Sequence, residues 1–430
     1  MLKQNKLIKD ILILGFAIFS MYFGAGNIIF PPYLGLSSTN DWGIAFVSYF
    51  IADIGFATLA MFALLKVGGH IEYLTHKIGT IAGILLTSSI ILSIGPLIAL
   101  PRTGATTYEM LVVPFFGDNL TNSIITSVIY YGLILIFTLK PTTMIEILGK
   151  FLTPALFIGL IIVIIKGIVT PFGDVSSAQS TKNVILEGML AGYQTLDVLA
   201  ALAFGIIIIK AVSDKGEYES PILRYKLIGY ASIVAAIFIF IIYFGLTYLG
   251  ATTSTTYTVD IERASLLNNI IFHLFGSAGN LLLGIIVFLA CFTTGSALTS
   301  LTAEYFSKLS HRRISYTTLI FVVTIFSIII TNIGLEFIIS FASPILAVVY
   351  PGAIVLVILI FFEKSIKNDN IYKFASFGAM GFSLLEVISE KTLHIEFLSK
   401  MPLHEYGFSW ILVSIIFGII GAFIPQKDNL

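Results

Sequence analysis

Glycine and asparagine residues interrupt the first apolar stretch of the chain, where backbone groups could bind a charged ligand. Segment 24–27 reads GAGN after an apolar run over 11–23, and a proline pair follows at 31–32. Glycine weakens a helix and proline removes a backbone donor. In hydrocarbon an unpaired backbone group costs several kcal/mol, so irregular backbone persists only where it is buried in protein or lines a cavity. Carbonyls near 20–23 could therefore hold a small cation, and N–H groups near 26–27 a carboxylate.

Close packing of two helices on Gly24 and Gly26 is the alternative, since small residues are common at membrane helix interfaces. Close packing explains neither Asn27 nor the proline pair, so the ligand site is the preferred interpretation.

A second polar interruption lies in the sixth apolar stretch, where segment 187–197 reads EGMLAGYQTLD. An ionised Asp197 costs roughly 2.5 to 3.5 kcal/mol inside a membrane and needs a compensating partner. It could cap the following half-helix, take up a proton or ion, or contact a substrate ammonium group. Asp53 and Glu187 are expected nearer the ends of their spans, where water could reach them. Arg102 is expected to end the third span at the outer surface, as an interfacial anchor.

Adjacent hydroxyl groups lie deep in the eighth apolar stretch, where segment 290–296 reads ACFTTGS. Thr293 and Thr294 could present lone pairs to a hard cation, which prefers several oxygen ligands. Hydroxyl groups in membrane helices also bond back to the preceding turn, and that alternative stays open. Among the phenylalanines, those near the interruptions, such as Phe204, are candidates for a pocket wall.

The composition places these residues in a membrane protein. Of 430 residues, 57% are hydrophobic and 11% charged, with a mean hydropathy of +0.98, whereas soluble domains are about 25% charged. A net charge of zero gives no basic surface for nucleic acid. The single cysteine, Cys291, excludes an internal disulfide, and the histidine spacings match no metal motif. The sequence has neither the paired carboxylates of a membrane enzyme nor the repeated filter residues of a channel.

Twelve apolar stretches of about 20 residues or more are predicted to span the membrane. They lie near 11–36, 43–66, 79–101, 121–139, 147–170, 185–209, 225–249, 270–305, 315–333, 335–362, 371–389 and 408–425. With the amino terminus assumed inside, 18 of the 24 Lys and Arg residues fall on the cytoplasmic side. This bias predicts that both termini are cytoplasmic. We expect one polytopic domain over 1–430.

The interruptions predict an internal repeat. They fall in spans one and six, five spans apart, and prolines fall in spans five (Pro154) and ten (Pro344 and Pro351). Two five-helix units of opposite topology, each starting with a broken helix, form the inverted repeat of secondary transporters, with the site at the midplane between the breaks. The predicted fold class is therefore an all-α integral membrane protein. Its repeats cover about 11–170 and 185–362, and two peripheral helices cover about 371–425.

These motifs resemble the branched-chain amino acid:cation symporters of the BrnQ type. The resemblance is carried by FGAGNIIFPP at 23–32, GPLIALPR at 95–102, the GYxTxD pattern at 192–197, and AC-x-x-T with a following AEYF at 290–306. The family is similar in turn to the leucine-transporter fold, which implies a 5+5 inverted repeat with two peripheral helices. It also implies import of leucine, isoleucine and valine with Na⁺, or in some members H⁺, across a bacterial-type plasma membrane.

The same resemblance implies roles for individual residues. Na⁺ would bind the carbonyls of Ser20, Phe23 and Ala290 and the hydroxyls of Thr293 and Thr294. The predicted substrate-binding residues are Gly24, Ala25, Gly26, Asn27, Tyr193, Thr195 and Asp197, with the α-carboxylate at the backbone of Ala25 and Gly26. Asp197 stands where the wider fold more often has a small polar residue, which leaves a second ion site open. Besides the lipid bilayer and the amino acid, no protein or nucleic-acid partner is expected. The alternative is an H⁺-coupled or differently specific amino acid or amine transporter of the same fold.

Overall fold

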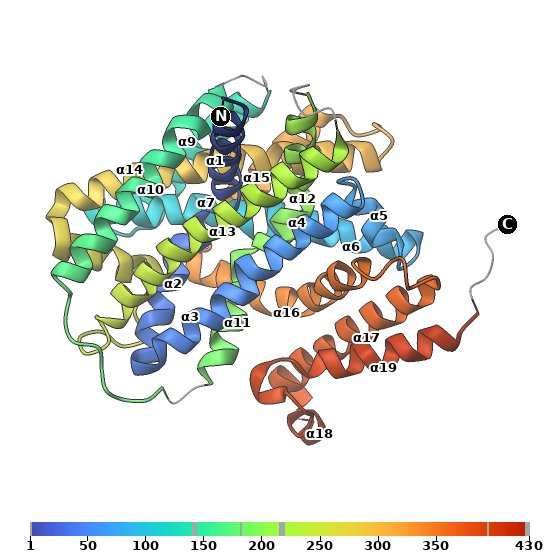
Figure 1. The fold of residues 1–430 in the computed structure, drawn as a ribbon. Helices are drawn as coiled ribbons and strands as arrows, with labels where there is room; N and C mark the ends of the chain where they lie inside the picture. Colours follow the sequence, from blue (N-terminus) through green and yellow to red (C-terminus); the bar gives the residue numbers. More distant parts are fainter. Residues whose placement is uncertain (1, 140–143, 181–182, 215–219, 394, 426–430) are drawn as a thin grey trace.

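The computed structural model describes residues 2–139, 144–180, 183–214, 220–393 and 395–425, and the regular structure within them is helical (Figure 1). The helices are α1 (Leu2–Tyr22), α2 (Ala25–Ser38), α3 (Trp42–Phe50), α4 (Phe56–Lys66), α5 (Ile71–His76), α6 (Thr80–Leu92), α7 (Ala99–Thr107), α8 (Val113–Phe116), α9 (Leu120–Leu139), α10 (Met144–Val169), α11 (Val184–Thr195), α12 (Asp197–Asp214), α13 (Pro221–Ala251), α14 (Arg263–Leu309), α15 (Tyr316–Thr331), α16 (Leu335–Ile360), α17 (Asp369–Ile388), α18 (Glu396–Ser399) and α19 (Ser409–Phe423).

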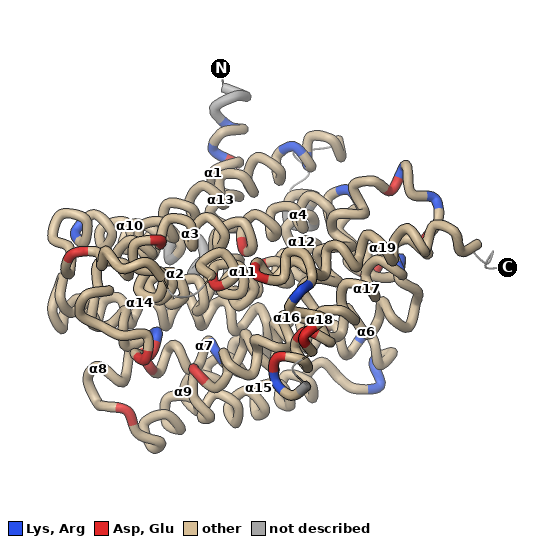
Figure 2. Tube along the Cα trace, turned by 90° about the horizontal axis from the view of Figure 1, so that it is seen from below, with Lys and Arg blue, Asp and Glu red and all other residues tan. Residues whose placement is uncertain are grey.

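The helices have the composition of a membrane protein. Within the described residues, eight helical stretches are long and apolar enough to cross a membrane, and three shorter apolar helices accompany them. Each predicted span coincides with one helix or with consecutive helices. Large apolar side chains such as Ile81 and Phe423 are exposed on the surface, as expected for helices that face lipid. Most charged residues lie at helix ends and in loops (Figure 2). The all-helical membrane fold is thus observed, whereas twelve spans and the inverted repeat remain predictions.

The interruption after α1 is shorter than predicted. Only Phe23 and Gly24 separate α1 from α2, and the prolines Pro31 and Pro32 lie inside α2. These prolines are in the second turn and beyond, where each removes one donor while the helix continues. The backbone of α2 at Pro32 packs closely against α13. A methyl group added at Gly250 of α13 would lie 1.8 Å from the carbonyl oxygen of Pro32.

Close packing of α11 on α3 positions a buried turn. A methyl group added at Gly188 would lie 2.4 Å from the carbonyl oxygen of Ala45, and one added at Gly192 would lie 2.9 Å from that of Tyr49. Only glycine permits backbones to approach so closely. The π-helical turn Ile51–Gly55, which follows α3, is thereby held beside the carboxyl-terminal end of α11.

The last two long helices form a separate pair. Helices α17 and α19 pack along each other, and α17 also packs against α16 (Figure 1). Gly378 of α17 supports this pair, since a methyl group there would lie 2.8 Å from the Phe417 side chain. The pair lies at one edge of the helical bundle (Figure 1), and its assignment as two peripheral helices outside the repeats stays a prediction.

Candidate functional site

The two interrupted stretches meet inside the helical bundle. Leu196 separates α11 from α12 with a left-handed backbone, φ 71° and ψ 11°. Asn27, the third residue of α2, donates a hydrogen bond from Nδ2 to Oδ2 of Asp197, the first residue of α12, over 2.7 Å. Both side chains are almost completely buried. The start of α2 and the start of α12 therefore form one polar centre.

A chain of buried hydrogen bonds extends from this centre to α13 and the turn after α3. The backbone N–H of Gly24 donates to Oδ1 of Asn27 at 2.9 Å, which fixes the orientation of the Asn27 amide. Asn27 Nδ2 also donates to the hydroxyl of Tyr243. That hydroxyl donates to Oδ2 of Asp53 at 2.7 Å, while Oδ1 of Asp53 lies 2.7 Å from the hydroxyl of Thr195. The predicted residues Asn27, Thr195 and Asp197 thus belong to one network.

Arg102 lies in this centre rather than at the outer surface, so its predicted role as an interfacial anchor is wrong. Its side chain is 2% exposed. The chain bends at Gly95, which has non-helical angles within the turn Ser93–Leu97, and α7 then directs Arg102 inward. The guanidinium donates to the carbonyls of Gln194 and Thr195, the last residues of α11. The last carbonyls of a helix receive no hydrogen bond from the helix itself, so Arg102 supplies their partner.

Asp53 is also buried, which contradicts the expectation that water could reach it. The helical stretch continues on both sides of it, from Trp42 to Lys66, so Asp53 lies at mid-length and not near an end. Glu187, in contrast, is partly exposed. Asp53, Arg102 and Tyr243 are therefore members of the centre that the sequence did not reveal. The small residues Gly188 and Gly192 signal a close helix contact, but not which helix makes it.

A small central cavity of about 30 Å³ lies between the two interruptions. It has room for roughly two water molecules. Six predicted residues line it, namely Gly24, Ala25, Asn27, Thr195, Asp197 and Thr294. Apolar side chains form the rest of the wall together with Tyr22, Arg102 and Thr103. The apolar residues are Met21, Ile94, Ala99, Leu196, Ala200, Phe204 and Leu298. Phe204 is therefore a wall residue, as expected. The cavity combines one cation, one carboxylate and an apolar surface.

The two threonines predicted to bind a cation have different surroundings. Thr294 lines the central cavity, and its Cγ2 lies 3.9 Å from the position that a methyl group on Gly24 would occupy. Thr293 donates its hydroxyl hydrogen to the carbonyl of Ala290 at 2.9 Å, which is the back-bonding alternative. A cation could still reach the remaining lone pairs of these oxygens.

The end of α1 supplies carbonyl groups near Thr294. The Phe23 N–H donates to the carbonyl of Phe19 at 2.8 Å, and this is the last bond of the helical pattern. The carbonyls from Ser20 onward therefore accept no hydrogen bond from a later N–H group of the helix. Oxygen ligands of this kind fit a hard cation such as Na⁺. These free carbonyl oxygens are compatible with the predicted cation site at Ser20 and Phe23.

Two larger cavities lie on either side of the central one along α11 and α12. One, of about 310 Å³, is lined on α11 by residues 187–194 and includes Arg263; we call it the Arg263 cavity. The other, of about 300 Å³, is lined on α12 by residues 203–207 and includes Lys308; we call it the Lys308 cavity. The central cavity is lined by residues 195–204 of the same two helices. The three cavities therefore follow one another along the interrupted stretch.

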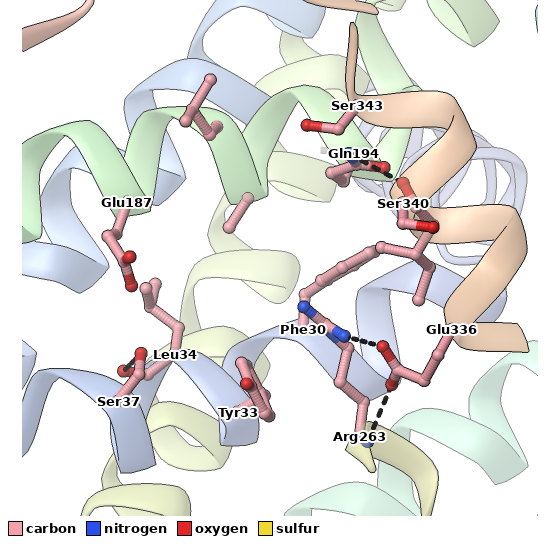
Figure 3. Close-up of a pocket in the computed structure, with 13 residues that line it drawn as sticks. Phe30, Tyr33, Leu34, Ser37, Glu187, Gln194, Arg263, Glu336, Ser340 and Ser343 are labelled. Atoms are coloured by element: carbon pink, nitrogen blue, oxygen red, sulfur yellow. Dashed lines mark hydrogen bonds and ion pairs between the residues drawn. The ribbon is translucent and has the colours of Figure 1, made fainter. Parts of the chain in front are cut away.

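An aromatic ring and an ion pair line the Arg263 cavity (Figure 3). The guanidinium of Arg263 pairs with the carboxylate of Glu336, and the Arg263 backbone N–H donates to Glu336 Oε1 at 3.1 Å. The Phe30 ring lies 5.6 Å from the guanidinium carbon of Arg263 and 5.6 Å from that of Arg102. Both distances are within the range of cation–π attraction. Phe30 is therefore held between the two arginines.

Tyr193 does not line the central cavity. Its ring stacks on Tyr350 with 4.6 Å between ring centres. It faces a separate cavity of about 230 Å³ that Ser383 of α17 and Trp410 of α19 also line. Gly26 lies beside Arg102, because a methyl group at Gly26 would lie 2.9 Å from Nη2 of Arg102. A substrate role for Tyr193 stays a prediction.

Comparisons with known proteins match the whole length of the chain. The family model described as "Branched-chain amino acid transport protein" matches residues 7–428. The chain is 35% identical to the branched-chain amino acid permease BraB of Bacillus subtilis, over 98% of this chain and 96% of that protein. It is 34% identical to the branched-chain amino acid permease BrnQ of Salmonella typhimurium, over 96% and 94%.

A solved structure shares the fold at low sequence identity. The substrate-bound outward-open state of a Na⁺-coupled sialic acid symporter aligns with a TM-score of 0.61 and 13% identity, over 98% of this chain and 91% of that chain. This similarity concerns the arrangement of the helices.

Proposed function

Because the chain belongs to the family of branched-chain amino acid transport proteins, we propose that it imports leucine, isoleucine and valine by symport with Na⁺ through alternating access. The chain is a multi-span membrane transporter with the leucine-transporter fold, and not an enzyme. The observation that carries the proposal is the succession of three cavities along α11 and α12, with buried charges at the middle one.

The central cavity offers complementary partners for an aliphatic zwitterion. Asp197 could accept hydrogen bonds from the ammonium group. Nε of Arg102 is buried without a hydrogen-bond partner among the described residues, so it is available to a carboxylate, beside the N–H groups of Ala25 and Gly26 at the start of α2. The apolar wall would hold the side chain. Because a methylene changes binding by only about 1 to 3 kcal/mol, leucine, isoleucine and valine should compete with one another.

The cation would bind on the opposite side of the same cavity. Carbonyls of Ser20, Phe23 and Ala290 and hydroxyls of Thr293 and Thr294 form an oxygen-only set, which suits Na⁺. The relative that is named a Na⁺-coupled symporter supports this proposal through its shared fold. Such a cation would partly compensate the negative charge of Asp197 and thereby couple ion binding to substrate binding.

The proposed architecture has twelve spans, with a 5+5 inverted repeat that begins with the interrupted helices and with both termini in the cytoplasm. In this orientation the Arg263 cavity faces outward and the Lys308 cavity inward. Separation of Arg263 from Glu336 and movement of Phe30 would open the path from outside. Rearrangement around α6, α12 and α14 would open the path to the inside.

The decisive test is binding of radiolabelled leucine to purified protein across a Na⁺ titration at fixed pH. Because linkage is reciprocal, Na⁺ should raise leucine affinity and leucine should raise Na⁺ affinity. Thr294→Ala should shift the titration to higher Na⁺ concentration. Thr299→Ala is the matched control, because its hydroxyl bonds back to the carbonyl of Gly295 and does not line the central cavity.

The possible outcomes separate the parts of the proposal. Leucine binding without any Na⁺ effect would contradict Na⁺ coupling and favour the H⁺-coupled alternative. Binding of a different amino acid or an amine, but not leucine, would contradict the substrate assignment alone. Equal Na⁺ titrations for Thr294→Ala and the control would contradict the cation site.

A further inference from the structure

The hydroxyl group of Thr195 has more hydrogen-bond partners than it has hydrogens. Its Oγ1 lies 2.7 Å from Oδ1 of Asp53 and 2.6 Å from the carbonyl oxygen of Gly192. A threonine hydroxyl supplies one hydrogen, and a carbonyl oxygen supplies none. Two such short oxygen–oxygen contacts each require a hydrogen, so a second one must come from Asp53.

The other carboxyl oxygen of Asp53, Oδ2, acts as an acceptor in this chain of hydrogen bonds. Asn27 accepts from Gly24 N–H through Oδ1, so its Nδ2 faces Tyr243 and donates to the hydroxyl there. The hydrogen of the Tyr243 hydroxyl is then directed at Oδ2 of Asp53, which lies 2.7 Å away and acts as acceptor. The hydrogen that the second Thr195 contact requires therefore lies on Oδ1.

We infer that Asp53 is a proton-binding site, and that in this conformation it holds one proton on Oδ1 and donates it to Thr195. The hydroxyl of Thr195 then donates to Gly192, and every hydrogen bond in the chain has one donor. The ligand of this site is a single proton.

The burial of charge supports the same assignment. In the part of the chain that the structure describes, three charged side chains are almost fully buried: Asp53, Arg102 and Asp197. One arginine can compensate only one carboxylate, and an uncompensated buried charge is strongly unfavourable. A neutral Asp53 leaves Arg102 and Asp197 as the balanced pair. Besides these two, the ionisable groups around Asp53 are the tyrosines Tyr22, Tyr49, Tyr243 and Tyr350.

The proton site lies against the second interruption. Thr195 is the last residue of α11, directly before the left-handed Leu196, and its carbonyl accepts a hydrogen bond from Arg102. Loss of the proton from Asp53 would leave one of the two Thr195 contacts without a hydrogen. Release of the proton should therefore loosen the junction of α11 and α12. This role in the transport cycle rests on the proposed function, whereas proton binding itself does not.

Infrared spectroscopy tests the proton directly. A protonated carboxylic acid has a carbonyl-stretch band that an ionised carboxylate lacks. At neutral pH the native protein should show such a band, Asp53→Asn should lower its intensity by the contribution of one carboxyl group, and Asp197→Asn should leave the intensity unchanged. A native spectrum without this band, or one in which Asp53→Asn leaves the band unchanged, would overturn the inference.

The pH profile of leucine binding supplies a second readout. The side-chain amide that Asp53→Asn introduces can donate to Thr195 as a protonated carboxyl does, but it does not titrate. Raising the pH should weaken leucine binding to the native protein by about tenfold for each unit above the point of proton release, and the profile of Asp53→Asn should be flat over that range. Identical profiles would overturn the role in transport. Absence of leucine binding at every pH would contradict the proposed function, and the infrared band would still test the proton.

Discussion

Asn27 Nδ2 donates to Asp197 Oδ2 over 2.7 Å, and this bond joins the start of α2 to the start of α12 although 170 positions separate the two residues. Both ends of the contact follow an interruption of a helix. The bond therefore makes each half-helix sensitive to the position of the other.

Replacement of Asn27 by alanine should abolish most leucine binding. The substitution removes the donor to Asp197 and to Tyr243 and leaves a buried carboxylate short of partners, at a cost of about 1 to 3 kcal/mol. Equilibrium binding and thermal unfolding of the purified protein measure both effects. Asn40→Ala is the control, since Asn40 is exposed. Native affinity in Asn27→Ala would contradict the central role of this bond.

Arg102→Lys should weaken leucine binding by at least about tenfold although the charge is kept. The planar guanidinium donates to two carbonyls at the end of α11 from separate nitrogens, and a lysine ammonium on a flexible stem does not reproduce that fork. Titration with radiolabelled leucine measures the change. Arg313→Lys, at an exposed position, should behave as the native protein. A lysine variant with native affinity would show that charge alone is needed.

Gly192→Ala should disturb the site without touching any polar group. The added methyl group would lie 2.6 Å from Cβ of Ala52 and 2.9 Å from the carbonyl oxygen of Tyr49, so α11 must move away from α3 and the following turn. We expect a lower melting temperature and weaker leucine binding, because Thr195 moves away from Asp53. The matched control is Gly132→Ala in α9, where no atom lies within 4 Å of the added methyl group. Equal losses in the two variants would contradict the packing argument.

Acid should destabilise the contact between α5 and the segment after α16. The Tyr73 hydroxyl donates to Glu363 at 2.6 Å, and Lys77 lies 3.3 Å from the same oxygen. Together these groups hold the pKa of Glu363 below its usual value of 4.5, with the Tyr73 hydrogen bond as the main cause. A lowered folded-state pKa gives stability that is present above the unfolded pKa and is lost as the pH falls through the folded one.

Thermal unfolding between neutral pH and about pH 3 measures this effect. Because Glu363 is partly exposed, the change should be small. Glu363→Gln should flatten the acid side of the profile, and Glu396→Gln, at a highly exposed position, should not. A native acid profile in Glu363→Gln would rule out this contact as the cause.

The sequence predicts the local features of the site better than its long-range contacts. The interruptions near Gly24 and before Asp197 are visible because glycine and polar residues break an apolar helical stretch. Thr294 is visible because a hydroxyl group is unusual there. Each of these signals depends on residues that are close together in the sequence.

The partners of these residues depend on packing and are not visible in the same way. Asp53 is one acid in an otherwise apolar stretch, and its contact with Thr195 depends on the close approach of α11 to α3 at Gly192. Arg102 follows two prolines, which suggested a helix end. The bend at Gly95 instead redirects α7 into the bundle. Such long-range geometry could not be obtained from residue spacing.

The three buried charges also determine how the membrane potential acts on transport. With Asp53 protonated, Arg102 and Asp197 cancel, so the unloaded centre carries no net charge. A zwitterionic amino acid adds none, and in the proposed symport with one Na⁺ the ion adds a single positive charge. The electrical work, about 2.3 kcal/mol per 100 mV for a full crossing, then falls on the loaded half of the cycle. While Asp53 keeps its proton, an inside-negative membrane potential would drive the loaded carrier inward, and the empty carrier would return independently of voltage.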